Sequence, residues 1–207
     1  MVEAYMKQSA LAHLGLNARS APDGPTGVKM AEVANTGKIG LRLDASNKKI
    51  LDAAEKALGF ALPIEANTVT SKGKKSALWL GPNEWLLTTD QPEKLQKALT
   101  KALENHHAAV YVVTDSRITI SLSGKNARDV LKKGCGIDLH PKVFGPGQCA
   151  QTPLALGHAL IHQVVETKKT KAATYHVTVH RSFAEYTWAW LEDAAGEYGV
   201  TYRQIAG

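Results

Sequence analysis

The sequence lacks the features that mark membrane-spanning and secreted proteins. No apolar run approaches the roughly 18 residues that a membrane-spanning helix needs. Residues 1–16 contain an acidic side chain, Glu3, and no uninterrupted apolar core, so they do not resemble a signal peptide. With 2 Cys in 207 residues, a disulfide scaffold is excluded. We expect a cytoplasmic protein that does not enter a membrane and whose Cys135 and Cys149 are reduced.

The sequence also lacks the motifs by which common catalytic and cofactor sites are recognised. A phosphate-binding P-loop, a GxSxG nucleophile elbow, a His-Glu zinc helix and a CxxC pair are all missing. Gly134-Cys135-Gly136 lacks the third glycine of a dinucleotide-binding loop and does not directly follow a strand. His140 lies near Cys135, which leaves a cysteine nucleophile open as an alternative to a packed thiol. We predict no catalytic, cofactor-binding or metal-binding residue in this chain.

The positive charge of the chain comes mainly from lysine. The formal net charge is +6, with 19 Lys against 6 Arg. Lysines gather at residues 72–75 and 168–171, which we interpret as solvated loops, with contact to an acidic partner protein as the alternative. Proteins that read nucleic acids favour arginine with aromatic neighbours, so we expect no binding of nucleic acid.

Residues 39–63 and 118–141 share a strand pattern followed by helical spacing. Three alternating apolar residues open each stretch: Ile39, Leu41 and Leu43 in the first, Ile118, Ile120 and Leu122 in the second. Each stretch ends with a glycine, an apolar residue after it, and then a proline, which is Pro63 in the first and Pro141 in the second. Two strand-like runs and a helix follow each stretch. We therefore predict an α+β fold of two pseudo-repeated β-α-β-β-α units, with two unrelated strand-helix pairs as the alternative.

The repeat divides the chain into four segments. We expect residues 37–104 and 105–199 to be the two repeats. Residues 1–36 are expected to form an N-terminal arm that packs on its own domain or on a partner, because they are more apolar than a free tail needs to be. Residues 200–207 are expected to be a frayed tail.

Local signals predict where several elements begin and end. Two pairs have the spacing of a capping box at a helix start: Asp90 with Glu93, and Ser182 with Glu185. Gly134 and Gly136 are expected to end a helix in left-handed geometry. The arm is expected to contain a short helix at 10–16 and a strand at Val28–Val33.

Four histidines fall on two strands that we expect to pair, at residues 154–165 and 174–179. If the hairpin turns near Lys169, all four lie on one face of the sheet, with His162 opposite His176 and His158 opposite His180. Imidazole is a common zinc ligand. The two cross-strand pairs would lie about 13 Å apart, however, so one ion could take at most two of them. We expect a half-polar surface and no structural metal.

Four motifs together resemble the gamma subunit of heterotetrameric sarcosine oxidase. They occur in the order expected of that family: WLGPNEWLL at 79–87, DVLKKGCGIDLHP at 129–141, FGPGQCAQT at 144–152 and RSFAEYTWAWLEDAA at 181–195. The resemblance as a whole runs over roughly residues 11–199. The resemblance implies a fold similar to the folate-binding domain of glycine-cleavage aminomethyltransferases. Those relatives use an acidic residue near their N-terminal region, but the sequence around Asp23 does not match that motif.

The resemblance also implies a function within a larger enzyme. The family's holoenzyme contains alpha, beta, gamma and delta subunits and oxidises sarcosine to glycine with oxygen. It releases hydrogen peroxide, and the one-carbon unit leaves as formaldehyde or as methylene-tetrahydrofolate. FAD, FMN and NAD belong to the alpha and beta subunits and zinc to delta, with tetrahydrofolate as co-substrate. The resemblance therefore implies a structural subunit without a cofactor; a folate-binding one-carbon transfer protein in its own right is the alternative.

One tryptophan is a candidate for contact with a partner. Trp188 fits the apolar stripe of the helix expected after Ser182, whereas Trp190 lies about 160° from that stripe. Aromatic side chains are enriched at the buried centres of protein interfaces. Trp190 is therefore a possible interface residue, with packing under the N-terminal arm of its own domain as the alternative.

Overall fold

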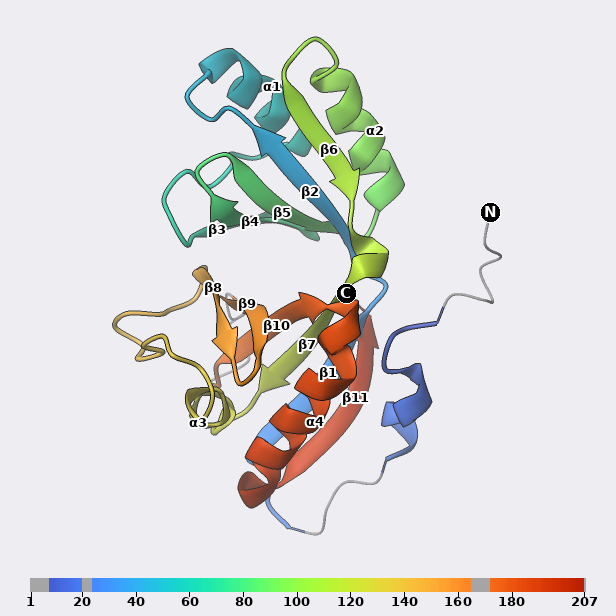
Figure 1. The fold of residues 1–207 in the computed structure, drawn as a ribbon, viewed down its shortest axis with the longest axis vertical. Coiled ribbons are helices and arrows are strands. Elements are labelled where there is room, and N and C mark those ends of the chain that lie inside the picture. The colour runs from blue at the N-terminus through green and yellow to red at the C-terminus, as the bar shows by residue number, and fades with distance from the viewer. Residues whose placement is uncertain (1–7, 20–23, 165–171, 207) are drawn as a thin grey trace. The chain divides into compact units, whose positions relative to one another are not determined.

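The computed structural model describes residues 8–19, 24–164 and 172–206, and the chain forms two compact units (Figure 1). Unit 1 is assembled from three segments: Met1–Ala34, Asp115–Pro146 and Gln151–Ala206. Unit 2 is formed by Asn35–Thr114 together with the short piece Gly147–Ala150. Unit 2 is thus almost continuous in sequence, whereas unit 1 is interrupted by it.

Unit 2 is a five-stranded antiparallel sheet in the order β3-β4-β5-β2-β6, with two helices on one face (Figure 1). Its elements are β2 (Gly37–Leu43), α1 (Lys48–Leu58), β3 (Val69–Lys72), β4 (Lys75–Gly81), β5 (Glu84–Thr89), α2 (Pro92–Ala102) and β6 (Ala108–Val112). The core lies between the sheet and the helices, where Leu41 and Trp85 of the strands meet Ala54 and Leu99 of the helices. Alternating apolar residues in the strands and a three-to-four spacing in the helices build this core.

The lysines of the 72–75 loop stabilise the C-terminal end of α1. Asn47 caps the helix start, since its side chain accepts a hydrogen bond from the backbone N–H of Lys49 at 3.1 Å. At the other end, the Nζ of Lys72 donates to the carbonyl of Gly59 at 2.8 Å, and the Nζ of Lys75 donates to that of Leu58. Cations are favoured at a helix C-terminus, so two of these lysines have a structural role beyond solvation.

Unit 1 is a six-stranded sheet in the order β11-β1-β7-β10-β9-β8, with α3 and α4 packed against each other. Its strands are β1 (Val28–Ala34), β7 (Arg117–Ser123), β8 (Cys149–Leu154), β9 (Gly157–Gln163), β10 (Thr174–His180) and β11 (Val200–Ala206). Its helices are α3 (Ala127–Lys132) and α4 (Ala184–Ala195). Trp188 and Leu191 of α4 are fully buried, as are Ile120 of β7 and Val177 of β10.

The predicted duplication is confirmed, because the segments at Ile39 and Ile118 are both strands followed by helices. The repeat is longer than predicted, since each copy has two strands more than the predicted five elements: β3 and β6 in unit 2, and β8 and β11 in unit 1. The sheet of unit 2 runs β3-β4-β5-β2-β6, and the corresponding strands of unit 1 run β8-β9-β10-β7-β11 with β1 inserted before the last. β1 pairs antiparallel with β7 and parallel with β11, so β11 keeps the direction relative to β7 that β6 has relative to β2.

The ends of the chain differ most from the sequence expectations. The predicted frayed tail is wrong, because residues 200–206 form β11, which pairs with β1 over its whole length. The strand expected at Val28–Val33 exists as β1, but it is an internal strand of unit 1 rather than part of an arm. The compact units also do not follow the predicted boundaries, since β6 belongs to unit 2. The strand expected at 154–165 is observed as the shorter β9, and a turn separates it from β8, which ends at Leu154.

The predicted helix ends are also corrected. α2 begins with Pro92 after Gln91, and Asp90 instead forms an ion pair with Lys74 at 3.2 Å. A 3-10 turn, Arg181–Phe183, leads into α4, and no side-chain cap closes its start, so neither capping box forms. Neither Gly134 nor Gly136 has a positive φ, so neither ends the helix in left-handed geometry. The helix expected at 10–16 is replaced by two 3-10 turns, Ala12–Leu14 and Leu16–Ala18.

Candidate interaction surface

A row of aromatic side chains runs along the outer side of α4. Phe183, Tyr186 and Trp190 follow one another at spacings of three and four residues, which places them on one side of the helix. Phe183 is 43% exposed, Tyr186 is 37% exposed and Trp190 is half-buried. The core stripe of the same helix contains Trp188 and Leu191 instead. The helix therefore has a buried aliphatic and aromatic face and a second, partly exposed aromatic row.

The turn between β8 and β9 extends this row. Leu156, in the turn, is 88% exposed, and its backbone N–H donates a hydrogen bond to the hydroxyl of Tyr186 at 3.1 Å. Ala155 has a φ of 52°, which a residue with a Cβ rarely adopts. Phe183 lies beside Gly157, at the start of β9. A strained turn thus presents a large apolar side chain next to the aromatic row.

Trp190 packs against the end of α3 within unit 1. A Cβ at Gly134 would lie 2.5 Å from Cζ2 of the indole, so only a glycine allows the ring to approach this closely. The backbone N–H of Ala155 donates to the carbonyl of Gly134 at 2.9 Å. Close approach of the indole is therefore the reason for a glycine at 134, whereas we had predicted left-handed geometry.

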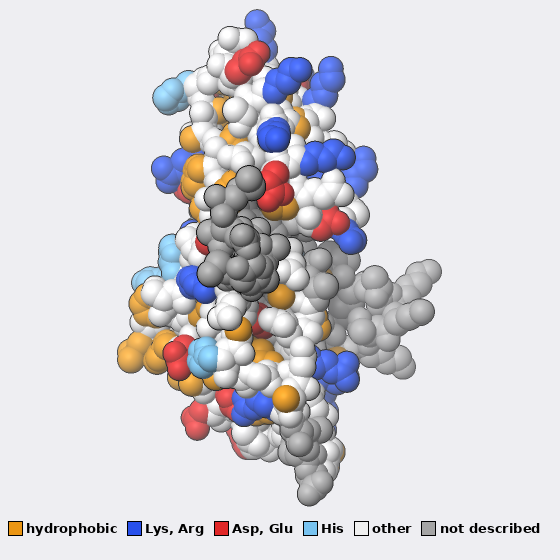
Figure 2. All heavy atoms as spheres, turned by 90° about the vertical axis from the view of Figure 1, so that its right-hand side faces the viewer, with side chains coloured by type: hydrophobic (Ala, Val, Ile, Leu, Met, Phe, Trp, Pro, Cys, Tyr) orange, Lys and Arg blue, Asp and Glu red, His pale blue; other side chains and the backbone are white. Residues whose placement is uncertain are grey.

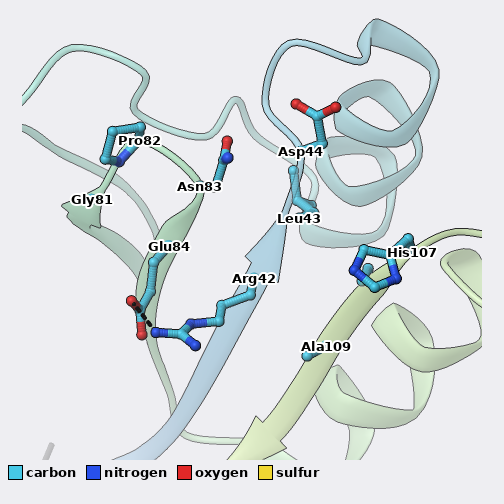
Figure 3. Close-up of a pocket in the computed structure, with 10 residues that line it drawn as sticks. Arg42, Leu43, Asp44, Gly81, Pro82, Asn83, Glu84, His107 and Ala109 are labelled. Carbon is cyan, nitrogen blue, oxygen red and sulfur yellow. Dashed lines mark hydrogen bonds and ion pairs between the residues drawn. The ribbon is translucent and has the colours of Figure 1, made fainter.

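An open hollow of about 600 Å³ lies in unit 2, at the edge where β2 ends and β5 and β6 begin (Figure 3). Arg42 and Glu84 face each other across it, with Nη2 and Oε2 2.8 Å apart, and this carboxylate raises the pKa of Arg42. The Tyr111 hydroxyl donates to the other oxygen of Glu84 at 3.2 Å. His107 lies on the far side of the hollow, on the approach to β6 (Figure 3).

Most polar side chains that line this hollow are engaged in hydrogen bonds within the chain. Both oxygens of Glu84 accept hydrogen bonds, and Asp44 accepts from the backbone and side chain of Ser46. Asn83 is engaged too, since its Oδ1 accepts from the backbone N–H of Ala45 at 3.0 Å. None of the described residues that line the hollow carries a hydroxyl or thiol nucleophile. We interpret it as a structural feature of the Pro82–Asn83 turn.

The histidine pairing is partly as predicted. His162 lies opposite His176 in the register of β9 and β10, with ring centroids 6.0 Å apart and planes at 89°. His158 and His180 are exposed, and the paired register of these strands ends before it reaches them. Lys169, where we placed the hairpin turn, lies outside the described residues, as do Lys168, Lys171 and Asp23. Across the parts of the chain that the structure covers, there is no cluster of three or more His, Cys, Asp or Glu that could hold a metal ion.

His162 is held in its neutral form by its surroundings. Its side chain is 8% exposed, and burial, together with the neighbouring His176, lowers its pKa to about 3. In the unfolded chain it returns to an ordinary pKa of about 6.5. At a pH between these two pKa values, His162 binds a proton in the unfolded state but not in the folded state.

We therefore expect the free energy of unfolding to fall as the pH drops from about 6.5 towards 3. His162 should contribute a loss of roughly 2 kcal/mol by pH 4.5. His162→Gln removes the titrating group, so its stability should depend less on pH in this window. His158→Gln, on the same strand but exposed, is the control and should behave as the wild type. Urea unfolding of the three proteins between pH 7 and pH 4.5 measures this; equal pH slopes would contradict it.

The two cysteines are free thiols in different environments. Cys149 is buried, and burial raises its pKa to about 11. Its Sγ lies 3.6 Å from the carbonyl of Thr68 and 3.5 Å from that of Trp79. Cys135 is half-buried at the end of α3 and bridges to Leu154 through its backbone. A high pKa and an enclosed position make Cys149 a packing residue rather than a nucleophile.

Charged side chains of both signs occur on the face drawn in Figure 2. Figure 2 shows Lys and Arg side chains scattered over the visible face, with Asp and Glu among them. Several of them are paired, such as Arg19 with Glu192 and Lys133 with Glu197. Among the described residues, no helix is long and apolar enough to cross a membrane.

The architecture of the chain identifies its fold class. Its fold is that of aminomethyltransferases: glycine cleavage system aminomethyltransferase T from Bartonella henselae superposes with a TM-score of 0.66, covering 97% of this chain and 59% of that chain at 13% identity. At this identity the likeness establishes the fold alone. The predicted α+β class, with its likeness to the aminomethyltransferase folate-binding domain, is confirmed.

The family follows from closer relatives. A model described as "Sarcosine oxidase, gamma subunit family" matches residues 42–197. Sarcosine oxidase subunit gamma of Corynebacterium sp. (strain U-96) is 33% identical over 198 residues, 94% of this chain and 93% of the relative. The subunit gamma of Arthrobacter sp is 31% identical over 172 residues, 83% of this chain and 81% of the relative. The chain belongs to the sarcosine oxidase gamma subunit family.

A solved structure supports the same assignment. A chain of heterotetrameric sarcosine oxidase from Corynebacterium sp. U-96, in complex with pyrrole 2-carboxylate, superposes with a TM-score of 0.83 at 31% identity. The superposition covers 93% of this chain and 96% of that chain. The resemblance that we identified from four sequence motifs is therefore confirmed.

Sequence reasoning found only part of the interaction surface. The position of Trp190 away from the core stripe was recognised, but Phe183, Tyr186 and Leu156 were missed. The spacing Phe-x-x-Tyr-x-x-x-Trp is visible in the sequence and could have indicated the row on α4. The contribution of Leu156 could not be found in this way, because residue 156 was expected within a strand, whereas it lies in the turn between β8 and β9.

Proposed function

We propose that this chain is a non-catalytic structural subunit of a heterotetrameric sarcosine oxidase. The holoenzyme would oxidise sarcosine to glycine with oxygen, releasing hydrogen peroxide and either formaldehyde or methylene-tetrahydrofolate. The observation that carries the proposal is the match, over nearly the whole length of both chains, to a chain of a heterotetrameric sarcosine oxidase.

The same proposal specifies partners, cofactors and location. The partners are the alpha, beta and delta subunits of the complex, without nucleic acid or a membrane. FAD, FMN, NAD and zinc are held by those subunits, tetrahydrofolate is a co-substrate, and the complex is cytoplasmic. The described residues give no support for a flavin or dinucleotide site in this chain, since no glycine-rich loop follows a strand in the required pattern.

A folate-binding one-carbon transfer protein is the second candidate. The observation that favours it is the aminomethyltransferase fold, which covers 97% of the chain. Fold alone is weak support for function, because one architecture serves many sites. We rank it below the structural role for this reason.

Co-expression with the other three subunits tests the proposed function. We expect an affinity tag on this chain to recover all four subunits, and the recovered complex to consume oxygen with sarcosine while the chain alone does not. Equilibrium titration of the isolated chain with tetrahydrofolate separates the second candidate, for which binding at micromolar concentration is expected. Recovery of the chain without partners, or oxygen consumption by the chain alone, would overturn the structural role.

A further inference from the structure

We propose that this chain binds a second copy of itself through β6, the open edge strand of the sheet in unit 2. The two β6 strands run antiparallel about a two-fold axis at Val110 and join the two sheets into one. The inference goes beyond the proposed function and does not rest on it, because it depends only on residues of unit 2.

The two edges of the sheet in unit 2 differ. β3 lies at one edge, where the backbone N–H of Val69 donates to the carbonyl of Gly147 at 2.8 Å and Thr68 bridges to Gln148. β6 lies at the other edge, and among the described strands it pairs with β2 alone (Figure 1). β6 is thus the edge to which a further strand can be added.

The backbone of β6 presents hydrogen-bonding groups to this open side. Val113 donates its N–H to the carbonyl of Lys38 at 2.9 Å, one position beyond the last register pair of β6 with β2. Hydrogen bonds to one neighbour alternate along an antiparallel strand, so the odd-numbered residues bond to β2 and the even-numbered residues face outward. Among the described residues, the outward N–H and C=O groups of Ala108, Val110 and Val112 have no hydrogen-bond partner. Such a row is a template for another strand.

The side chains of β6 do not protect this edge. The strand, AAVYV, contains no charged residue or proline, and its register with β2 has no bulge, although these are the usual means of protecting an edge. The ring of Tyr111 lies over Gly40, where a Cβ would come within 2.3 Å of its Cζ, and its hydroxyl donates to Glu84 of β5. Tyr111, the largest side chain of the strand, therefore turns inward and leaves the outer edge clear.

The strand is complementary to itself, which is why a second copy fits it. With Val110 opposite Val110 of the second copy, outward residues meet outward residues, and each such pair exchanges two hydrogen bonds. Ala109 then faces Tyr111 and Ala108 faces Val112, so each large side chain lies beside a small one. No like charges meet within the pair, because β6 has none. Ala108 and Val110 already pack against the core of unit 2, and the pairing extends that core from one copy to the other.

Val112→Pro tests the backbone pairing. Its N–H faces outward, so proline removes a donor to the second copy and leaves the hydrogen bonds to β2 in place. We expect the full-length wild-type chain to dimerise reversibly in the micromolar range, because a pair of five-residue strands is a small interface. Val112→Pro should weaken dimerisation at least tenfold, and Val112→Thr, which keeps both the shape and the N–H, should change it less than threefold. Sedimentation equilibrium of the three proteins measures this.

Val110→Cys and Val112→Cys test the register. In the proposed pair the two residues 110 lie directly opposite each other, with Cα atoms about 5.5 Å apart, which a disulfide can span. The two residues 112 are displaced by four positions, roughly 13 Å along the strands, which is too far. We expect mild oxidation to link Val110→Cys into covalent dimers. Val112→Cys, although position 112 is the more exposed, should be linked no more than the wild type.

Each outcome decides for or against the pairing. A wild-type chain that stays monomeric through the micromolar range overturns it, as does a dimer that folded Val112→Pro leaves intact or equal linking of the two cysteine variants. Thermal melting shows whether the variants fold, and if Val112→Pro does not, the cysteine variants decide. A monomeric chain that still assembles with the other subunits leaves the proposed function standing while the pairing fails. A dimer that recovers no other subunit on co-expression does the reverse.

Discussion

Gly124→Ala is expected to lower the free energy of unfolding by about 3 kcal/mol or more. Gly124 has a φ of 116°, which disfavours any residue with a Cβ. A Cβ there would also lie 2.3 Å from the carbonyl oxygen of Gly27. That oxygen accepts a hydrogen bond from the backbone N–H of Asn126 at 3.1 Å, so it cannot move away without breaking the connection between β1 and α3. Urea unfolding measures the loss.

Gly24→Ala separates the two causes. Gly24 has a φ of 112°, almost that of Gly124, but a Cβ there would have no atom of the described residues within 4 Å. It should therefore show the cost of the backbone angle alone, about 1–2 kcal/mol. If both variants lose the same stability, the close approach to Gly27 contributes nothing and the explanation is wrong.

Trp85→Ala is expected to cost unit 2 about 3–5 kcal/mol. The side chain of Trp85 is fully buried in the core between the sheet and the helices. Its Nε1 donates to the carbonyl of Pro63 at 2.7 Å, so truncation leaves both a cavity and an acceptor without its donor. The smaller change Trp85→Phe should still cost about 2 kcal/mol, since it too removes the donor.

Trp79 provides the matched control. It lies directly opposite Trp85 in the register of β4 and β5, but it is only half-buried, and its buried Nε1–H has no acceptor among the described residues. Trp79→Phe removes a donor without an acceptor and should change stability by less than about 1 kcal/mol. Chemical unfolding of the two Phe variants side by side measures the difference. If Trp79→Phe lost as much stability as Trp85→Phe, the size of the ring alone would determine the loss.

The strands and helices of the repeat could be predicted because their residues are patterned locally. Alternation at Ile39 and Ile118 and the three-to-four spacing that follows reflect one buried face per element, which the sequence records directly. The resemblance to a known family then indicated which α+β fold these elements form.

The remaining elements depend on contacts between distant residues. β11 pairs with β1, which is far away in sequence, and its polar residues Arg203 and Gln204 hide its strand character. Capping boxes failed because Pro92 can begin a helix without a side-chain cap, and because a 3-10 turn precedes α4. Gly134 was read as a helix terminator because its actual neighbour, Trp190, lies 56 positions away in the sequence.

The interaction surface was only partly predictable for the same reason. Position along a helix reveals that Trp190 leaves the core stripe, because helical geometry is periodic. Whether that side chain is covered by its own unit is a question of tertiary structure. Leu156 becomes exposed only through the turn that separates β8 from β9.

The insertion of β1 between β7 and β11 has a consequence for how the chain is made. A ribosome releases β1 first, then the nearly continuous unit 2, and only afterwards the strands on either side of β1. Unit 2 can complete most of its sheet during synthesis, whereas β1 has neither of its neighbours until β7 and finally β11 emerge. At about 5–20 residues per second, this delay is roughly ten seconds or more. β1 presents two unpaired edges until β7 emerges and one until β11 follows, and such edges invite association with other chains. Nascent unit 1 is therefore the part of this protein on which a chaperone would act.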